Sequence, residues 1–426
     1  SLSYTQDSFL GASETRMAYT QTKNQNVRGF LQEGFADNGV TPNADGYQQN
    51  VTRNEWYFDS HVTSALSEIS DLMWGIDINQ GEGKQRSNNF EYAVLPNGSN
   101  APTWQTLPID EQTFLEDERT FTGLYANVDF QLSPQWRVEA GLRWNYIREM
   151  REGEEIDLTG PTPIALENEG ESESDQRWSG TLSSSYLLWQ QGKDYLTVYG
   201  SYRDSFKPAA IDFGPEAESE LLDPEDAQSV ELGLRGQNGD GTLRWDVAAF
   251  DMKFHNLVVR QAVNGLPALV NGGDEHFKGA EAEAQWQLSD QLTLLGSYAW
   301  HQAKFADYVR LFGNTPTQLR GKRLEMSPED LAALGIHYGS HDGFNAHVDA
   351  NYVGDVFLNK RNTALAESYT VLDAGVGFAF NHWNVNLDVY NATDKRNPTA
   401  ESELGDAQYY RHPKHEVWLS VAHQFN

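Results

Sequence analysis

The sequence predicts an all-β protein, an antiparallel transmembrane β-barrel, and three observations lead to that fold class. Apolar and polar side chains alternate along many short segments, which is the period-two pattern of a β-strand. The connections between these segments alternate between short turns and long polar loops, as they do in membrane-spanning barrels. Aromatic residues make up 12% of the chain, which is enough for a girdle at each membrane interface.

Composition excludes several other classes of protein. The mean hydropathy is −0.62 and only 39% of the residues are apolar. No run approaches the about 20 apolar residues that a spanning helix requires, whereas a barrel tolerates low hydropathy because alternate residues face a polar lumen. The net charge of −31 argues against a nucleic-acid partner. The chain has no cysteine, as expected for a bacterial envelope protein.

The clearest hairpins lie in the middle of the chain. Ala227–Arg235 and Thr242–His255 alternate regularly on either side of an Asn-Gly-Asp-Gly turn, which supplies the positive φ angles of a tight hairpin. Gly279–Leu288 and Gln291–His301 repeat the arrangement across Ser289-Asp290. These segments therefore predict a run of antiparallel hairpins.

Shorter stretches of the same alternation occur on both sides of this region, and Trp136–Ile147 is the most regular of them. Together they predict about sixteen full strands, with the short turns and both termini on the periplasmic side. The remaining predicted strands are Ser3–Ser8, Glu14–Lys23, Thr52–Leu66, Leu72–Gln80, Phe121–Leu132, Trp136–Ile147, Arg177–Trp189, Tyr195–Arg203, Leu334–Tyr338, Phe344–Phe357, Tyr369–Phe380, Trp383–Tyr390 and Glu416–Phe425.

Polar stretches between the strands predict long outer loops. Asn24–Val51 is rich in Gly, Asn and Gln, and Gly81–Glu118 carries several prolines. Two further stretches are acidic: Glu149–Asp175 holds ten carboxylates against Arg151 alone, and Asp204–Asp226 continues the pattern. Such stretches are typical of solvated loops, and a Ca²⁺-binding role is the alternative, although no EF-hand spacing occurs.

Several motifs resemble the barrel domain of TonB-dependent outer-membrane transporters, especially the siderophore receptors. Five of them follow the family's order from about Phe121 to the C-terminus. They are Ser201–Pro208, Leu222–Glu225 leading into Val230–Gly233, Phe277–Glu283, Ser327-Pro328 ahead of Tyr338, and Tyr390–Lys395.

The resemblance implies a domain arrangement. Residues 1–426 are predicted to form one barrel domain of a family whose barrels have about 22 strands. Neither the family's plug domain nor its energy-coupling box is recognisable, so we expect the chain to be part of a longer protein, incomplete on its N-terminal side. The resemblance also implies a bacterial outer-membrane location, contact with lipid, coupling to the TonB complex through a plug outside this chain, and uptake of a ferric siderophore.

The same resemblance implies a binding vestibule lined by outer loops, where guanidinium and ammonium groups hold an anionic chelate and aromatic rings stack on it. The alternative for each basic residue is a wall-stabilising pair with a lumen carboxylate such as Glu231 or Asp388. For each aromatic residue the alternative is loop packing. The predicted ligand-binding residues are Arg203, Lys207, Arg260, Tyr308, Arg310, Arg361, Tyr409, Tyr410 and Arg411.

No catalytic motif is present, so the chain is predicted not to be an enzyme. His337, His341 and His347 flank one short turn without a recognisable ligand spacing, and neither a metal site nor a cofactor is predicted. The alternative function is a passive porin of about sixteen strands, which single-channel conductance distinguishes from a plugged importer.

Overall fold

The structure is a computed structural model. It describes residues 1–32, 40–95, 97–208, 213, 221–263, 266–312, 315–339, 343–402 and 405–425. Within these ranges the backbone alone is described at 166–169, 260–263, 266–268, 311, 401–402 and 405–408.

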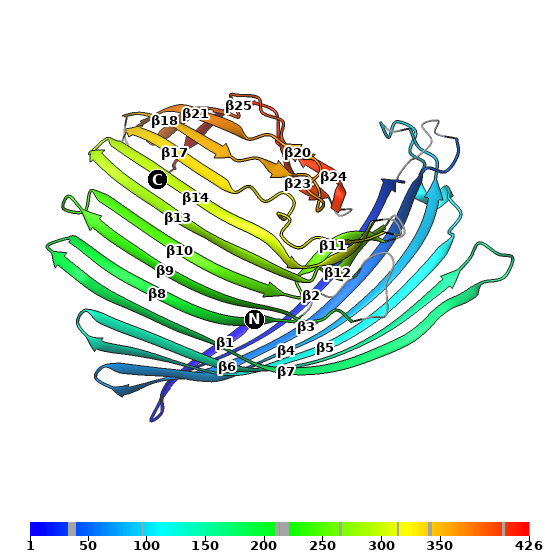
Figure 1. Cartoon of the computed structure of the whole chain (residues 1–426), viewed down its shortest axis with the longest axis horizontal. Helices are drawn as coiled ribbons and strands as arrows, with labels where there is room; N and C mark the ends of the chain where they lie inside the picture. The colour runs from blue at the N-terminus through cyan, green and yellow to red at the C-terminus, as the bar shows by residue number, and fades with distance from the viewer. Residues whose placement is uncertain are drawn as a thin grey trace.

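One antiparallel sheet of 17 strands dominates the described residues and curls into a tilted wall (Figure 1). Each strand pairs with the next one in the list below, so the sheet is a meander whose edges are β1 and β25. Its strands are β1 (Leu2–Ser8), β2 (Gly11–Leu31), β3 (Ala44–Ser67), β4 (Ser70–Tyr92), β5 (Glu111–Ser133), β6 (Trp136–Asp157), β7 (Ile164–Gln191), β8 (Asp194–Lys207), β9 (Glu225–Asn238), β10 (Leu243–His255), β13 (Asp274–Ser289), β14 (Leu292–Asp307), β17 (Asp330–Gly339), β18 (Gly343–Val353), β21 (Tyr369–Phe380), β22 (Trp383–Tyr390) and β25 (Glu416–His423).

Four small hairpins and one short 3₁₀ helix lie in the long loops at the opposite end from the tight turns. They are β11 (Val258–Val263) with β12 (Leu266–Asn271), β15 (Val309–Phe312) with β16 (Thr315–Gln318), β19 (Val356–Phe357) with β20 (Leu365–Ala366), β23 (Pro398–Ser402) with β24 (Gly405–Arg411), and η1 (Trp104–Thr106). Among the described residues no helix has the length and apolar character needed to cross a membrane.

The sheet confirms the all-β prediction and the expected number of strands, with two local differences. β18 ends at Val353 and a separate short strand follows, so Phe344–Phe357 is not one strand. β25 ends at His423 on the short-turn side, as predicted for the C-terminus. The N-terminus differs from the prediction, because Leu2 pairs with Met17 partway up the wall.

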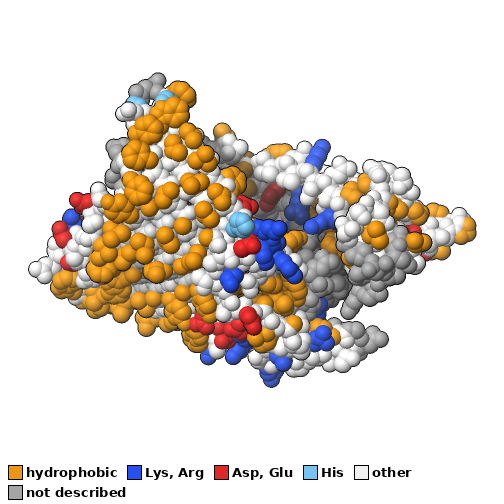
Figure 2. All heavy atoms as spheres, turned by 90° about the horizontal axis from the view of Figure 1, so that it is seen from above, with side chains coloured by type: hydrophobic (Ala, Val, Ile, Leu, Met, Phe, Trp, Pro, Cys, Tyr) orange, Lys and Arg blue, Asp and Glu red, His pale blue; other side chains and the backbone are white. Residues whose placement is uncertain are grey.

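The outer surface of the wall carries the apolar row that alternation predicts. Trp178, Trp144, Leu124 and Ile76 are register partners on four adjacent strands. Trp178 is 61% exposed and Leu124 48%, values that a soluble protein rarely shows for such residues. Figure 2 shows apolar side chains covering the part of the molecule that bears the tight turns. Such a belt is typical of the surface that a transmembrane barrel presents to lipid.

The belt stops well before strands β2–β7 end. On the outer surface Tyr146 is followed two residues later by Arg148, whose partners are Thr120 and Ser174. β4 and β6 nevertheless continue to Tyr92 and Asp157. We call this part of β2–β7, beyond the Arg148 row, the outer extension, and Figure 1 shows it projecting past the rest of the wall.

The outer extension corrects three loop predictions. Much of Asn24–Val51, Gly81–Glu118 and Glu149–Asp175 is paired strand. The sequence does not reveal these strands because both of their faces leave the hydrocarbon layer, so apolar alternation is no longer required there. Backbone pairing with a neighbour still satisfies their N–H and C=O groups.

On the inner surface, polar side chains lie flat against the wall and bond to one another. Arg143 Nη2 donates to Asp77 Oδ1 at 2.8 Å. A Cβ atom at Gly123, on the intervening strand, would lie 1.9 Å from the same nitrogen. Glycine at this position therefore makes room for the ion pair between its neighbours.

Asn391, within one of the recognised motifs, closes the outer end of β22. It has a φ of 48° and is 2% exposed. Its Nδ2 donates to the carbonyls of Lys395 and Pro413 at 2.9 and 2.8 Å, and its Oδ1 accepts from the Lys395 N–H at 2.9 Å. The motif thus requires a residue that tolerates the left-handed backbone conformation and whose side chain forms hydrogen bonds with the loop that follows β22.

Replacing Asn391 with alanine is expected to lower the free energy of unfolding by about 2–3 kcal/mol, because the hydrogen bonds are lost and the φ angle becomes strained. Asn391→Gly relieves the backbone strain and should cost about 1 kcal/mol less. Denaturant unfolding of the two variants in detergent measures the difference. Equal stabilities would show that backbone strain contributes nothing at this position.

Candidate functional site

Two outer loops meet at the ring of Phe312, and a third bonds to the second of them. The first loop joins β14 to β17 and carries the β15–β16 hairpin, at whose tip Phe312 lies. The second joins β18 to β21 and contributes Arg361, and the third joins β22 to β25 and contributes Tyr409. We call the group Tyr308, Arg310, Phe312, Arg361 and Tyr409 the Phe312 site.

An apolar cluster supports the Phe312 site from below. Phe305, Tyr308 and Leu319 are at most 8% exposed, and Phe312 packs against them. The rings of Phe305 and Tyr308 lie 5.4 Å apart, centroid to centroid. Tyr308 is therefore mainly a packing residue that fixes the base of the first loop, as the loop-packing alternative predicted.

Two guanidinium groups lie over the Phe312 ring. The Cζ atom of Arg361 is 4.7 Å from the ring centroid, and that of Arg310 is 5.3 Å away. Arg361 is exposed and has no carboxylate partner among the described residues. The cation–π contact of Arg361 occupies the face of its guanidinium group and leaves the N–H groups at its edge able to donate. The arrangement can therefore bind a carboxylate, hydroxamate or catecholate group while the aromatic face excludes water.

The first two loops are held together by hydrogen bonds and an ion pair around Arg323. Its backbone N–H donates to Asn362 Oδ1 at 2.8 Å, and the Asn362 amide donates back to the Arg323 carbonyl at 2.8 Å. Its guanidinium binds the side chain and the carbonyl of Asp355, at 3.2 and 2.7 Å. Arg361 is therefore positioned by its loop's attachment to the first loop.

The third loop joins the site through Tyr409, whose hydroxyl donates to the Leu358 carbonyl. Tyr410 is 54% exposed, and Arg411 at the end of β24 is exposed as well. The side chain of Arg260 lies outside the described residues, although its backbone belongs to β11. Of the nine predicted binding residues, the structure gathers Tyr308, Arg310, Arg361 and Tyr409.

Arg203 and Lys207 lie apart from this group, on the inner face of β8. Lys207 pairs with Glu225, which is the wall-stabilising role given above as the alternative. Arg203 lines a hollow with Glu139 and Glu231. Neither residue reaches the Phe312 ring.

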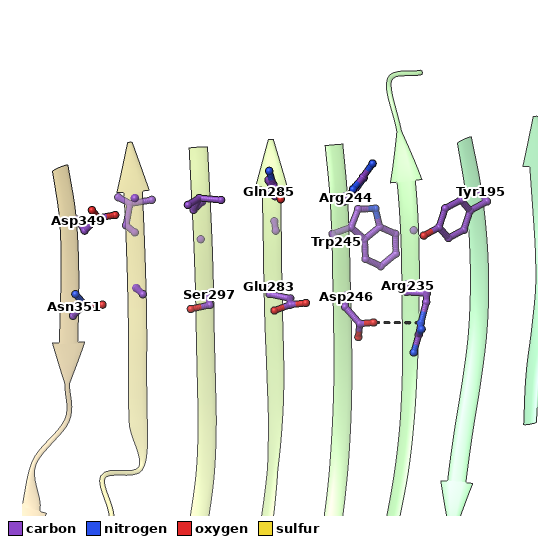
Figure 3. Close-up of a pocket in the computed structure, with 17 residues that line it drawn as sticks. Tyr195, Arg235, Arg244, Trp245, Asp246, Glu283, Gln285, Ser297, Asp349 and Asn351 are labelled. Atoms are coloured by element: carbon purple, nitrogen blue, oxygen red, sulfur yellow. Dashed lines mark ion pairs between the residues drawn. The ribbon is translucent and has the colours of Figure 1, made fainter. Parts of the chain in front are cut away.

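A second hollow of about 520 Å³ lies on the inner wall nearer the tight turns. Figure 3 shows polar side chains of β8, β9, β10, β13, β14 and β18 around it. Arg235 Nε lies 3.5 Å from Asp246 Oδ2 and already has this partner. Its lining mixes Arg235 and Arg244 with Asp246, Glu283 and Asp349, so this hollow is a weaker candidate for an anionic ligand than the Phe312 site.

Phe213, from the loop between β8 and β9, rests on the opposite wall. The Gln49 side chain donates to its carbonyl, and the Arg53 guanidinium lies 4.5 Å from its ring centroid. A Cβ atom at Gly83 would lie 2.3 Å from the ring. Phe213 therefore lies against the inner face, where it forms a second arginine–aromatic pair with Arg53.

Sequence reasoning missed Phe312, Phe213 and Arg53. Phe312 and Phe213 belong to loop segments without alternation, so no periodic signal distinguishes them from other loop positions. Arg53 lies in a predicted strand, where nothing in the sequence indicates a partner from a distant loop. The sequence did indicate Arg310 and Arg361, because both are basic residues near the outer ends of strands, where the outer loops begin. The pairing of each arginine with a ring depends on contacts between distant segments.

Comparison with known proteins agrees with this architecture. The family model described as TonB dependent receptor-like, beta-barrel matches residues 1–392. The ferrioxamine receptor of Yersinia enterocolitica is 28% identical over 400 residues, which cover 89% of this chain and 52% of that protein. The ferrichrome outer membrane transporter/phage receptor of Escherichia coli K12 is 28% identical over 245 residues, covering 53% of this chain and 31% of that one.

Solved structures show the same fold. The ferric yersiniabactin uptake receptor FyuA of Yersinia pestis superposes with a TM-score of 0.75 at 16% identity, covering 100% of this chain and 60% of that one. The unliganded ferric citrate transporter FecA gives a TM-score of 0.72 at 17% identity, covering 99% and 60%. The chain thus spans at most about half the length of these two curated relatives. With most of its length matched by one family model, this chain belongs to the TonB-dependent receptor-like β-barrel family.

Proposed function

We propose that this chain is the barrel of an outer-membrane receptor that takes up a ferric siderophore in a TonB-dependent manner. The ligand binds at the Phe312 site by hydrogen bonds and stacking, without a covalent step. Energy reaches the barrel from the TonB complex through a plug that is not part of this chain. The barrel itself supplies the wall, the vestibule in which the ligand binds and the path along which it crosses the membrane.

The observation that carries the proposal is the pair of guanidinium groups on the Phe312 ring at the outer mouth of the wall. Family membership places the protein in the bacterial outer membrane and agrees with the prediction that it is not an enzyme. Relatives are named as receptors for ferrioxamine and ferrichrome, which supports a siderophore as the ligand. Nothing in the described residues favours the porin alternative.

Replacing Arg361 with glutamine is expected to weaken binding of an anionic ferric siderophore by about tenfold to a hundredfold, because a charge-assisted hydrogen bond contributes about 1.5–3 kcal/mol. Titration of the full-length receptor in detergent, followed by tryptophan fluorescence or calorimetry, measures the change.

Arg320→Gln is the matched control. Arg320 is an arginine of the first loop that already pairs with Asp307 at 3.1 Å, and its replacement should leave the affinity within about twofold of the native value. Unchanged affinity in the Arg361 variant would exclude the Phe312 site. Steady single-channel conductance of the full-length native protein would instead support a porin.

A further inference from the structure

Glu275 is a buried carboxyl group without a hydrogen-bond partner. It lies at the outer end of β13, one residue after a register shift, and its backbone partner on β14 is Phe305. The residue is 1% exposed, and neither of its carboxylate oxygens has a hydrogen-bond partner among the described residues. A buried carboxylate in this state is costly unless a cation or a proton compensates it.

Glu275 lies outside the hydrocarbon layer. It shares its face of β13 with Glu281 and Glu283, which line inner-wall hollows, so its side chain points inward. The neighbouring outward-facing positions at this height are polar: Lys278 pairs with Asp251 and Gln302. The apolar belt therefore ends below Glu275, and the group belongs to the vestibule.

Charged groups from three other elements surround Glu275. Glu325 comes from the first loop and Lys360 from the second, and these two residues are paired with each other. Glu225 of β9 also faces it and is paired with Lys207 of β8. Lys360 is 1% exposed, whereas the Lys207 side chain is 68% exposed. Glu275 and Glu325 thus share a single buried ammonium group, whereas Glu225 pairs with a largely exposed one.

Two further pairs border the cluster. His255 lies 2.9 Å from Asp274, the residue before Glu275. Arg323 holds Asp355 of the second loop at 3.2 Å. Each of these side chains already has a partner, and neither pair is aimed at the Glu275 carboxyl group. Among the described residues no group of three or more ligating side chains is arranged to hold a metal ion.

We propose that Glu275 is a proton-binding latch that keeps the first and second outer loops docked over the vestibule while its carboxyl group is protonated. The neutral carboxyl sits beside Glu325 without repulsion, so the Glu325–Lys360 pair can bridge the two loops. Loss of the proton leaves a buried negative charge against Glu325 that the attraction of Lys360 does not offset, which favours opening of the docked loops so that water reaches the carboxylate. Arg361 is the next residue, so the latch controls the position of the Phe312 site.

Burial, with Glu325 and Glu225 nearby, raises the pKa of Glu275 to about 8, against an ordinary value of 4.5. The docked loops therefore hold a proton that the opened loops release between these two pH values. The stabilisation is complete below about pH 4.5 and is lost as the pH rises towards 8. Opening is expected to become about tenfold more favourable per pH unit within this window.

Hydrogen exchange of the full-length receptor tests the latch without any ligand. The reporters are backbone amides with partners across or within the docked loops: Leu324 to Ala303 and Met326 to Phe357, both at 2.9 Å, and Leu358 to Ala364 at 2.8 Å. After correction for intrinsic exchange rates, their protection factors should fall about tenfold per pH unit between about pH 5 and 8. Glu275→Gln, which mimics the neutral carboxyl, should remove this slope.

Glu367→Gln is the matched control, because Glu367 is an exposed glutamate of the second loop, and it should keep the native slope. Glu325→Gln removes the adjacent carboxylate, so the pH range over which protection falls should end at a lower pH. A flat profile in the native protein, or an unchanged slope in Glu275→Gln, would overturn the proposal. If the protection factors respond to added calcium at fixed pH but do not respond to pH, the carboxylate cluster binds a metal cation and the proposal is also overturned.

Discussion

Replacing Arg151 with methionine is expected to lower the free energy of unfolding by about 3–5 kcal/mol, because it leaves buried carboxylates without their counter-charge. Arg151 is 2% exposed and Asp117 is fully buried. Arg151 Nε donates to Asp117 Oδ2 at 3.2 Å, and its Nη2 lies 3.8 Å from Glu149 Oε1. Arg119 donates to the other oxygen of Glu149 at 2.7 Å.

The experiment is denaturant unfolding at constant pH, with two comparison variants. Asp117→Asn combined with Arg151→Met removes both charges, so it should recover much of the lost stability. Arg148→Met changes an arginine on the outer surface of the same strand and should be nearly neutral. A loss of stability below about 1 kcal/mol in the Arg151 variant would contradict the prediction. It would show that water or a proton compensates the Asp117 carboxylate once the guanidinium group is gone.

The same network predicts a dependence on pH. Burial, with Asp117 nearby, raises the pKa of Glu149 to about 7 despite the opposing effect of Arg119. The folded outer extension therefore binds a proton that the unfolded chain releases above about pH 4.5. Stability from this group is greatest below that pH and is lost as the pH rises through about 7. In the Arg151→Met variant, this loss of stability should extend to higher pH.

Arginine at position 142 is the second change with a large expected effect. Leu142 lies midway between Trp136 and Tyr146 on the outer surface of β6 and is 56% exposed. A guanidinium at this height faces acyl chains, so Leu142→Arg should cost about 2–4 kcal/mol in a lipid bilayer. Reversible unfolding in lipid vesicles measures that cost.

Gln80→Arg is the control for the position of the belt. Gln80 is exposed and pairs with Thr120 in the polar row just above the apolar belt. The same substitution there should change stability by less than about 1 kcal/mol. Equal costs at the two positions would contradict the boundary between the belt and the outer extension.

The sequence predicted strands where two faces meet different solvents. Trp136–Ile147 alternates because one face contacts lipid and the other lines a wet lumen, and its partners on both sides follow the predicted order. Above the belt that constraint disappears. Asn24–Val51 therefore looked like a loop, although β2 and β3 continue through much of it.

The candidate site was only partly accessible from the sequence. Arg310 and Arg361 were identified by charge and by their position at the ends of strands. Their common partner Phe312 was not, because it lies in an aperiodic hairpin tip and the two arginines come from different loops. Glu275 was missed for a similar reason: its burial depends on segments about 50 and 85 residues further along the chain.

Local alternation and turn chemistry, which act between near neighbours, thus determined the fold class, the lipid-facing positions and the order of the hairpins. Tertiary structure decided which charges are buried, which loops meet and which side chain lacks a counter-charge. Those outcomes are set by desolvation, and desolvation depends on how distant segments pack against one another.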